Sequence, residues 1–170
     1  MPRSEIAEKP FMARKRKPGG LDTPPDSSLS QQDAESLMRT PKTLPTTLAC
    51  IELVEGMNRD WDLGGEGEGL RLIVSRSGKN PKHAKYQLMA KRFVVLARFE
   101  IEGPAHTNPD GLIVPCPHIH RYCEGAPDAW AKPASDLFGN PDDLVECLSG
   151  FLVYCNIVQA PPIRTLRRLF

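Results

Sequence analysis

Long apolar runs are lacking in this sequence, which argues against a helix that spans a membrane. The longest useful run, Phe93 to Ala97, is far shorter than the roughly 20 residues that such a helix needs. The N-terminus carries charges but lacks the apolar segment of a secretory signal. The five cysteines form no regular framework, and an odd number of them favours free thiols in a reducing compartment. We therefore expect a cytoplasmic protein without a membrane partner.

A strong net charge is also lacking, because the formal total is +1 over 170 residues. That total hides a local excess, since from Leu70 to Arg98 every Asp, Glu, Lys or Arg position is a lysine or an arginine. Such a surface favours RNA or another anionic partner, although these side chains could instead balance the acidic segment before them. The predicted nucleic-acid contacts are Arg71, Arg76, Lys85, Lys91 and Arg92.

A phosphate-binding loop is missing as well. The segment from Asp60 to Gly69 is rich in glycine, but it lacks the Gly-Lys-Ser/Thr ending of a P-loop. Its acidic side chains would repel phosphate. We interpret this segment as a flexible loop and predict no cofactor.

The chain divides into a tail and one domain. Residues 1–45 are rich in Pro, Ser, Gln and Gly and carry few large apolar side chains, so they predict a disordered basic tail. A short helix is expected inside this segment, from Ser30 to Arg39. Residues 46–170 predict a single α+β domain.

Apolar residues alternate with polar ones along several segments of this domain, which indicates strands. In the last of these segments Phe93 is expected on the same side as Phe99, and Arg98 and Glu100 on the other side. The predicted strands cover residues 46–55, 70–75, 85–91 and 93–101.

The C-terminal part predicts a hairpin and then a helix. The hairpin is expected over Cys123 to Trp130, and Asn140 is the expected N-cap of a helix that continues to Cys155. Residues 163–170 predict a last strand or a partner-binding peptide. The expected fold is therefore α+β, an antiparallel β-sheet packed against one main C-terminal helix, with a disordered N-terminal tail.

Reactive side chains are concentrated between His106 and Cys123, a stretch that holds three of the four histidines. From His118 onward this stretch predicts a strand. Because residues two apart share a face of a strand, we expect His118, His120 and Tyr122 to point the same way.

One chemistry for this stretch is metal binding. Zinc accepts Cys and His ligands, but the spacing of Cys116, His118, His120 and Cys123 matches no usual zinc knuckle. A site of His106, His118 and His120 is geometrically easier and resembles the His-x-His pairs of cupin barrels. The Glu and His further along a cupin pattern are absent, so we assign no metal.

A second chemistry is metal-independent cleavage of RNA. It needs a base for the 2′-hydroxyl, an acid for the leaving oxygen and cations for the phosphate, and imidazoles serve as acid or base near neutral pH. We name His118 and His120 as acid/base candidates, His106 and Tyr122 as support, and Arg98 as the phosphate contact. The protein would then be a ribonuclease-like toxin or accessory factor, by fold-level analogy with small endoribonuclease toxins.

A third interpretation involves no chemistry. His118 and His120 would hydrogen-bond the turn at Asn108 and Asp110 and fix a hairpin. The protein would then be a non-enzymatic inhibitor or interaction module, with a protein partner such as an antitoxin or a defence protein.

The chain also resembles a family of uncharacterised bacterial and prophage proteins. Residues 98–111, Pro115 to Tyr122 and the run Tyr154-Cys155-Asn156-Ile157 are similar to its pattern H-x-N-P-D-G, P-H-h-H-h-Y and a C-terminal helix ending Y-C-N-I. The resemblance covers about residues 70–157, and Glu100 stands where the pattern has aspartate. It implies a bacterial or phage origin and makes the histidine stretch the family hallmark.

Overall fold

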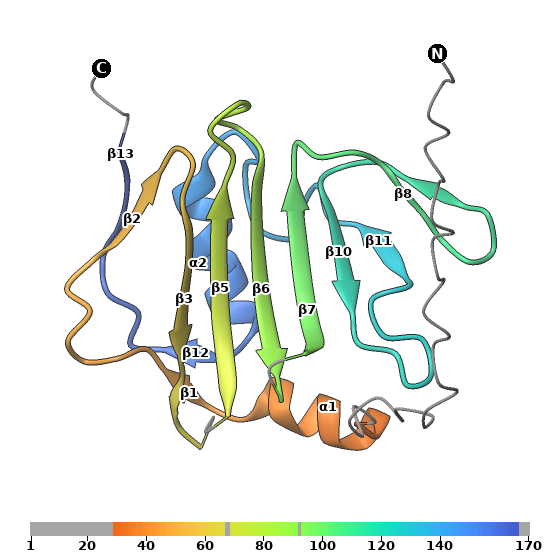
Figure 1. Cartoon of the computed structure of the whole chain (residues 1–170), viewed down its shortest axis with the longest axis horizontal. Helices are drawn as coiled ribbons and strands as arrows, with labels where there is room; N and C mark the ends of the chain where they lie inside the picture. Colours follow the sequence, from red (N-terminus) through yellow and green to blue (C-terminus); the bar gives the residue numbers. More distant parts are fainter. Residues whose placement is uncertain (1–28, 67–68, 92, 167–170) are drawn as a thin grey trace, which may run out of the picture.

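The computed structural model describes residues 29–66, 69–91 and 93–166, and its centre is a six-stranded antiparallel sheet. The helix α2 (Leu144–Tyr154) lies behind this sheet in Figure 1. The fold is therefore α+β, as the sequence predicts. In spatial order the strands of the sheet are β11 (Ala131–Pro133), β10 (His118–Arg121), β7 (Val94–Ile101), β6 (Ala84–Ala90), β5 (Leu70–Arg76) and β3 (Asn58–Asp62).

The hydrophobic core lies between this sheet and α2. Phe151 of the helix is fully buried, and its ring centroid lies 6.0 Å from that of Tyr86 on β6. The Tyr86 hydroxyl donates to the main-chain oxygen of Leu144 over 3.0 Å, so the one polar atom of this ring is satisfied inside the core. Burial on this scale contributes roughly 1.5–3 kcal/mol for each large side chain.

The start and end of α2 follow from its local sequence. Asp143 caps the helix by accepting from the main-chain nitrogens of Val145 and Glu146, so the expected N-cap at Asn140 is wrong by one turn. Asn156 follows the helix with a φ of 53°, a left-handed conformation that asparagine tolerates. Within the described residues, no helix is both long and apolar enough to cross a membrane.

Smaller elements close the remaining sides of the core. The helix α1 (Gln31–Arg39) begins at Ser30, whose side chain accepts from the main-chain nitrogen of Asp33. The short strands are β1 (Lys42–Thr43), β4 (Gly64–Gly65) and β12 (Ile157–Val158) in one sheet, β2 (Ile51–Val54) with β13 (Ile163–Leu166) in a parallel pair, and β8 (His106–Thr107) with β9 (Ile113–Val114) in an antiparallel pair.

The folded unit begins earlier than the sequence predicts. Leu29 and Met38 belong to the core, and Lys42 is fully buried. The Lys42 ammonium donates to the main-chain oxygens of Met38, Thr40 and Cys155, which joins the end of α1 to the end of α2. Residues 29–45 are thus part of the domain, whereas residues 1–28 of the predicted tail lie outside the described residues.

Strand β7 differs from the expected alternation at its start. Leu88 pairs with Ala97 but Met89 pairs with Val95, so one extra residue, Leu96, is inserted in β7. The two sides exchange at this bulge. Phe93, expected beside Phe99, is 68% exposed, and the prediction for this end of the strand is wrong.

The acidic glycine-rich segment is also more ordered than a flexible loop. Its first part forms β3, which pairs with β5, and its middle part forms β4. Asp60 and Asp62 lie 3.2 and 3.1 Å from the guanidinium of Arg71 on β5. The acidic side chains therefore balance a basic one across the sheet.

Candidate functional site

The face of the main sheet opposite α2, here called the open face, carries the polar side chains. His118 lies directly opposite Glu100 in the register, and Glu100 lies opposite Lys85. His120 lies opposite Arg98 in the same way. Because directly paired residues point to one side of a sheet, the register confirms that His118 and His120 share a face.

The three histidines between residues 106 and 120, here called the histidine cluster, come together on this face. The ring centroids of His118 and His120 are 5.1 Å apart, and the His106 ring lies 6.1 and 4.5 Å from them. His106 belongs to β8, and its Nε2 donates to the main-chain oxygen of Ala129 over 2.9 Å. His106 is half-buried, whereas His118 and His120 are 1% and 0% exposed.

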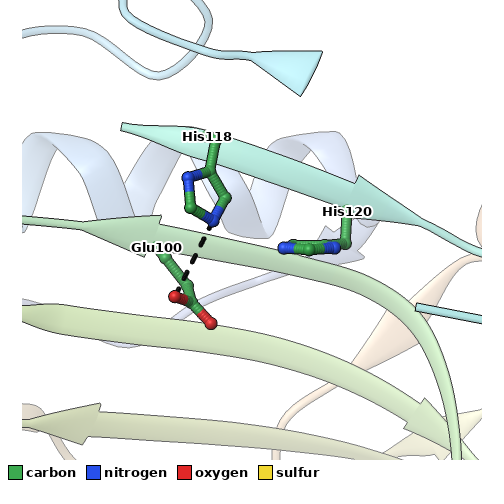
Figure 2. Close-up of side chains that lie close together, drawn as sticks. All are labelled: Glu100, His118 and His120. Atoms are coloured by element: carbon green, nitrogen blue, oxygen red, sulfur yellow. Dashed lines mark ion pairs between the residues drawn. The ribbon is translucent and has the colours of Figure 1, made fainter. Parts of the chain in front are cut away.

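Arg98 connects the cluster to two carboxylates. Its Nη2 lies 3.0 Å from His120 Nε2, and its Nη1 pairs with the carboxylate of Asp128. Its Nε lies 2.9 Å from Glu100 Oε1. The other oxygen of Glu100 lies 3.7 Å from His118 Nε2, as the dashed line in Figure 2 shows.

These contacts fix the protonation of His120. A guanidinium has no acceptor, so Nε2 of His120 accepts from Arg98. The ring proton is then on Nδ1, which donates to the main-chain oxygen of Asp128 over 3.2 Å. Burial and the neighbouring Arg98 charge lower the pKa of His120 to about 3, so this imidazole is neutral at neutral pH.

His118 is shifted in the same direction. Burial lowers its pKa, although the carboxylate of Glu100 acts in the opposite direction. Its Nδ1 lies 3.5 Å from the Sγ of Cys116, and burial raises the pKa of that thiol. The other ring nitrogen, Nε2, faces Glu100 at 3.7 Å, which is too long for a close hydrogen bond.

Two buried polar atoms beside the cluster lack a hydrogen-bond partner: Nε of Arg98 and Oδ1 of Asp128. The Arg98 Nε is close enough to Glu100 for an ion pair but is not aligned for a hydrogen bond. Burial also raises the pKa of Asp128, against the opposing effect of Arg98. Unsatisfied buried groups are uncommon in native proteins. This corner of the site thus contains polar atoms that the hydrogen bonds within the protein do not satisfy.

Three atoms converge on Gly103, the residue that follows β7 and Glu102. A Cβ at this position would lie 3.2 Å from His83 Nε2 and 3.5 Å from both Cys116 Sγ and Glu100 Oε2. The absence of a side chain at Gly103 therefore lets these groups approach one another at the His118 end of the cluster.

The structure does not bring Tyr122 to the imidazoles. Its ring belongs to the hydrophobic core, and its hydroxyl donates to the main-chain oxygen of Leu29. The expected common direction of His118, His120 and Tyr122 thus holds for the two histidines, whereas Tyr122 belongs to the core.

The hydrogen bonds of the turn at Asn108 differ from those that the third interpretation of the sequence predicts. The Asn108 side chain exchanges two hydrogen bonds with the main chain of Ala131, and Asp110 accepts from the nitrogen of Leu112. His106 bonds instead to Ala129, and His120 bonds to Asp128 and Arg98. The turn fixes the β8–β9 hairpin to β11, and the histidines are held by other groups.

A metal ion would find its ligands in Glu100, His118 and His120. One ligand atom from each lies within 4.8 Å of the others, and Figure 2 shows both imidazoles on the same side of β10 beside the Glu100 carboxylate. Cys123 points elsewhere, with its Sγ 3.8 Å from the main-chain oxygen of Glu124. The four-residue Cys/His zinc site considered from the sequence is therefore not assembled.

The predicted nucleic-acid contacts are dispersed. Lys85 lies half-buried on the open face, and Arg71 is engaged by Asp60 and Asp62. Arg76 is buried and donates to the main-chain oxygens of Pro81 and Leu53, each over 2.8 Å, so its guanidinium is already engaged within the fold. Lys91 is exposed after β6, and Arg92 lies outside the described residues.

Sequence reasoning missed two members of the site, Glu100 and Asp128. A signal for Glu100 was present, because alternation in its strand places it on the same side as Arg98. No local signal exists for Asp128, which lies in a turn and reaches His120 through the pairing of β10 with β11.

Fold and site together define an α+β protein that carries a covered histidine cluster on the open face of its main sheet. The chain belongs to the family described as "Family of unknown function (DUF6978)", whose model matches residues 29–157. The matched region contains the whole histidine cluster and both of its carboxylates. No curated protein and no solved structure matches the chain.

Proposed function

We propose that the protein is directed to nucleic acid and cleaves RNA without a metal ion, with imidazoles as the acid and the base. The observation that carries this proposal is the convergence of three imidazoles and Arg98 on the open face, with ring centroids 4.5–6.1 Å apart. Proton transfer of this kind requires titratable groups within hydrogen-bonding reach of one substrate. In a bacterial or phage setting the protein would act as a toxin or as an accessory factor.

The hydrogen bonds suggest a role for each imidazole. His118 is the base, because its Nε2 faces Glu100 at 3.7 Å and that carboxylate would stabilise the imidazolium formed. His106, the half-buried member, is the acid for the leaving oxygen. His120, held between Arg98 and Asp128, is a positioning residue for the guanidinium.

Substrate access requires movement of the segment that carries His106. This ring lies against both buried imidazoles, and it is attached through Ala129 to the loop before β11. We propose that RNA binding shifts β8 and β9 enough to expose His118 to the 2′-hydroxyl, while His106 stays within reach of the leaving oxygen. Lys85, beside Glu100 in the register, would contact the phosphate backbone.

The test is cleavage of single-stranded RNA by purified protein in EDTA. We expect His118→Ala and His106→Ala to lower the rate at least about 100-fold with the fold retained by circular dichroism. Lys132→Ala serves as control, because Lys132 pairs with Ile119 and so lies off the open face. Wild-type protein that leaves RNA intact would contradict the proposal.

A second candidate is a non-enzymatic interaction module with structural histidines. The near-complete burial of His118 and His120 favours it. Under this candidate the wild type binds RNA or a protein partner without cleaving RNA, and the double variant His118→Ala/His120→Ala unfolds. Cleavage that disappears in a double variant which still folds would exclude it.

A further inference from the structure

We infer that Glu100, His118 and His120 form a binding site for a divalent transition-metal ion such as Zn²⁺. These are two imidazoles and one carboxylate, a donor set found in zinc sites that keep an open coordination position. Their ligand atoms lie within 4.8 Å of one another on adjacent strands. The inference goes beyond the proposed RNA cleavage, which uses no metal.

The spacing of the donors suits an ion better than a direct bond. His118 Nε2 and Glu100 Oε2 are 3.7 Å apart, which is long for a hydrogen bond between them. Two ligands at roughly 2.0–2.2 Å from one zinc ion lie about 3.4 Å apart. A small closure of this pair would therefore hold the ion.

The far nitrogen of each imidazole already has a partner. His120 Nδ1 donates to the main-chain oxygen of Asp128, and its Nε2 presents a lone pair toward Arg98. His118 Nδ1 lies 3.5 Å from the Sγ of Cys116. Metal-binding histidines are usually oriented by such a contact at the nitrogen that does not bind the ion.

The positive guanidinium of Arg98 occupies the place that the metal ion would take. Its guanidinium lies between Glu100 and His120, and it must withdraw from the His120 nitrogen before an ion can bind there. Asp128 offers it a second position, because Nη1 already pairs with this carboxylate while Arg98 Nε and Asp128 Oδ1 lack hydrogen-bond partners. If Nη2 moved from His120 to Asp128 Oδ1, a two-point pair of Nη1 and Nη2 with this carboxylate would satisfy Oδ1 and free the His120 nitrogen for the ion.

The ion would also act on the proposed cleavage. It would occupy the lone pair of His118 that takes the substrate proton. Zn²⁺ should therefore inhibit RNA cleavage at concentrations that fill the site.

The test is titration of metal-depleted full-length protein with Zn²⁺ by calorimetry, with native mass spectrometry for the stoichiometry. We expect one ion per chain and a loss of affinity of at least about 10-fold in each of Glu100→Gln, His118→Ala and His120→Ala. Arg98→Ala should bind at least as tightly as the wild type, because it removes the competing cation. Cys123→Ser is the matched control and should bind normally.

The visible absorption of bound Co²⁺ reports the identity of the metal ligands directly. Co²⁺ bound to the wild type should give visible absorption without a thiolate-to-metal band, unchanged in Cys123→Ser and lost in His118→Ala. Absence of Zn²⁺ binding, binding unaffected by Glu100→Gln, or a thiolate band would overturn the inference. Cleavage in EDTA without Zn²⁺ binding would refute the metal site alone, whereas binding without any cleavage would refute the proposed function alone.

Discussion

Arg98 donates from its Nη2 to Nε2 of His120 over 3.0 Å, across two adjacent strands of the main sheet. This bond keeps a buried imidazole neutral and places a positive charge between two carboxylates. Most of the testable behaviour of the site follows from it.

The free energy of unfolding should fall in acid because the pKa of His120 is lowered in the folded protein. Its pKa is about 3 in the folded protein and 6.5 as the ordinary value, so the unfolded chain takes up a proton first as the pH falls. The stabilisation is full above about pH 6.5 and is lost progressively toward pH 3, with His118 contributing in the same direction. Thermal unfolding at pH 7 and about pH 4 should show a larger loss for the wild type than for His120→Gln, by a few kcal/mol at most. Equal losses would contradict the assignment.

Removal of Arg98 should release this constraint. In Arg98→Ala the neighbouring positive charge is gone, so the pKa of His120 should rise. NMR titration of the imidazole resonances measures this shift directly. Arg164→Ala is the control, because Arg164 pairs with Glu52 at the surface away from the cluster. An unchanged His120 titration in Arg98→Ala would argue against the bond that we describe.

Lys42 should matter for stability more than any exposed lysine. Lys42→Met keeps the volume but leaves three main-chain oxygens without their donor, those of Met38, Thr40 and Cys155. We expect a loss of roughly 2–4 kcal/mol in the free energy of unfolding, measured in urea. Lys79→Met, at an exposed turn, should change it by less than about 0.5 kcal/mol.

Lys85 should contribute to RNA affinity without sequence preference. Lys85→Ala should weaken binding to different single-stranded RNAs by a similar factor and reduce the slope of log affinity against log salt by about 0.7. Fluorescence anisotropy at several salt concentrations measures both. Lys132→Ala, on the edge strand β11 and off the open face, should leave the slope unchanged, and an equal effect of both substitutions would exclude a specific role for Lys85.

Much of the fold could be predicted from the sequence, because it depends on local periodicity. Alternation located β5, β6 and β7, and the apolar stripe after Asp143 located α2. The side shared by His118 and His120 also follows from their spacing of two residues.

Features that depend on register could not be predicted in this way. The bulge at Leu96 arises from the pairing of β6 with β7, and the approach of Asp128 to His120 requires the pairing of β10 with β11. Arg76 looks like a surface cation in the sequence, but it is buried because it satisfies main-chain oxygens of distant segments. The composition of residues 29–45 predicts disorder, but a few apolar side chains and Lys42 are enough to join this segment to the core.

The requirement for a 2′-hydroxyl distinguishes this cleavage mechanism from others. Metal-free cleavage by His118 requires a 2′-hydroxyl as the nucleophile, so a substrate with 2′-deoxy sugars should remain intact. We predict that the wild type in EDTA cuts the RNA strand, leaves cyclic phosphate ends and spares the deoxy strand of the same sequence. Equal cutting of both strands, or cutting of neither, would contradict it.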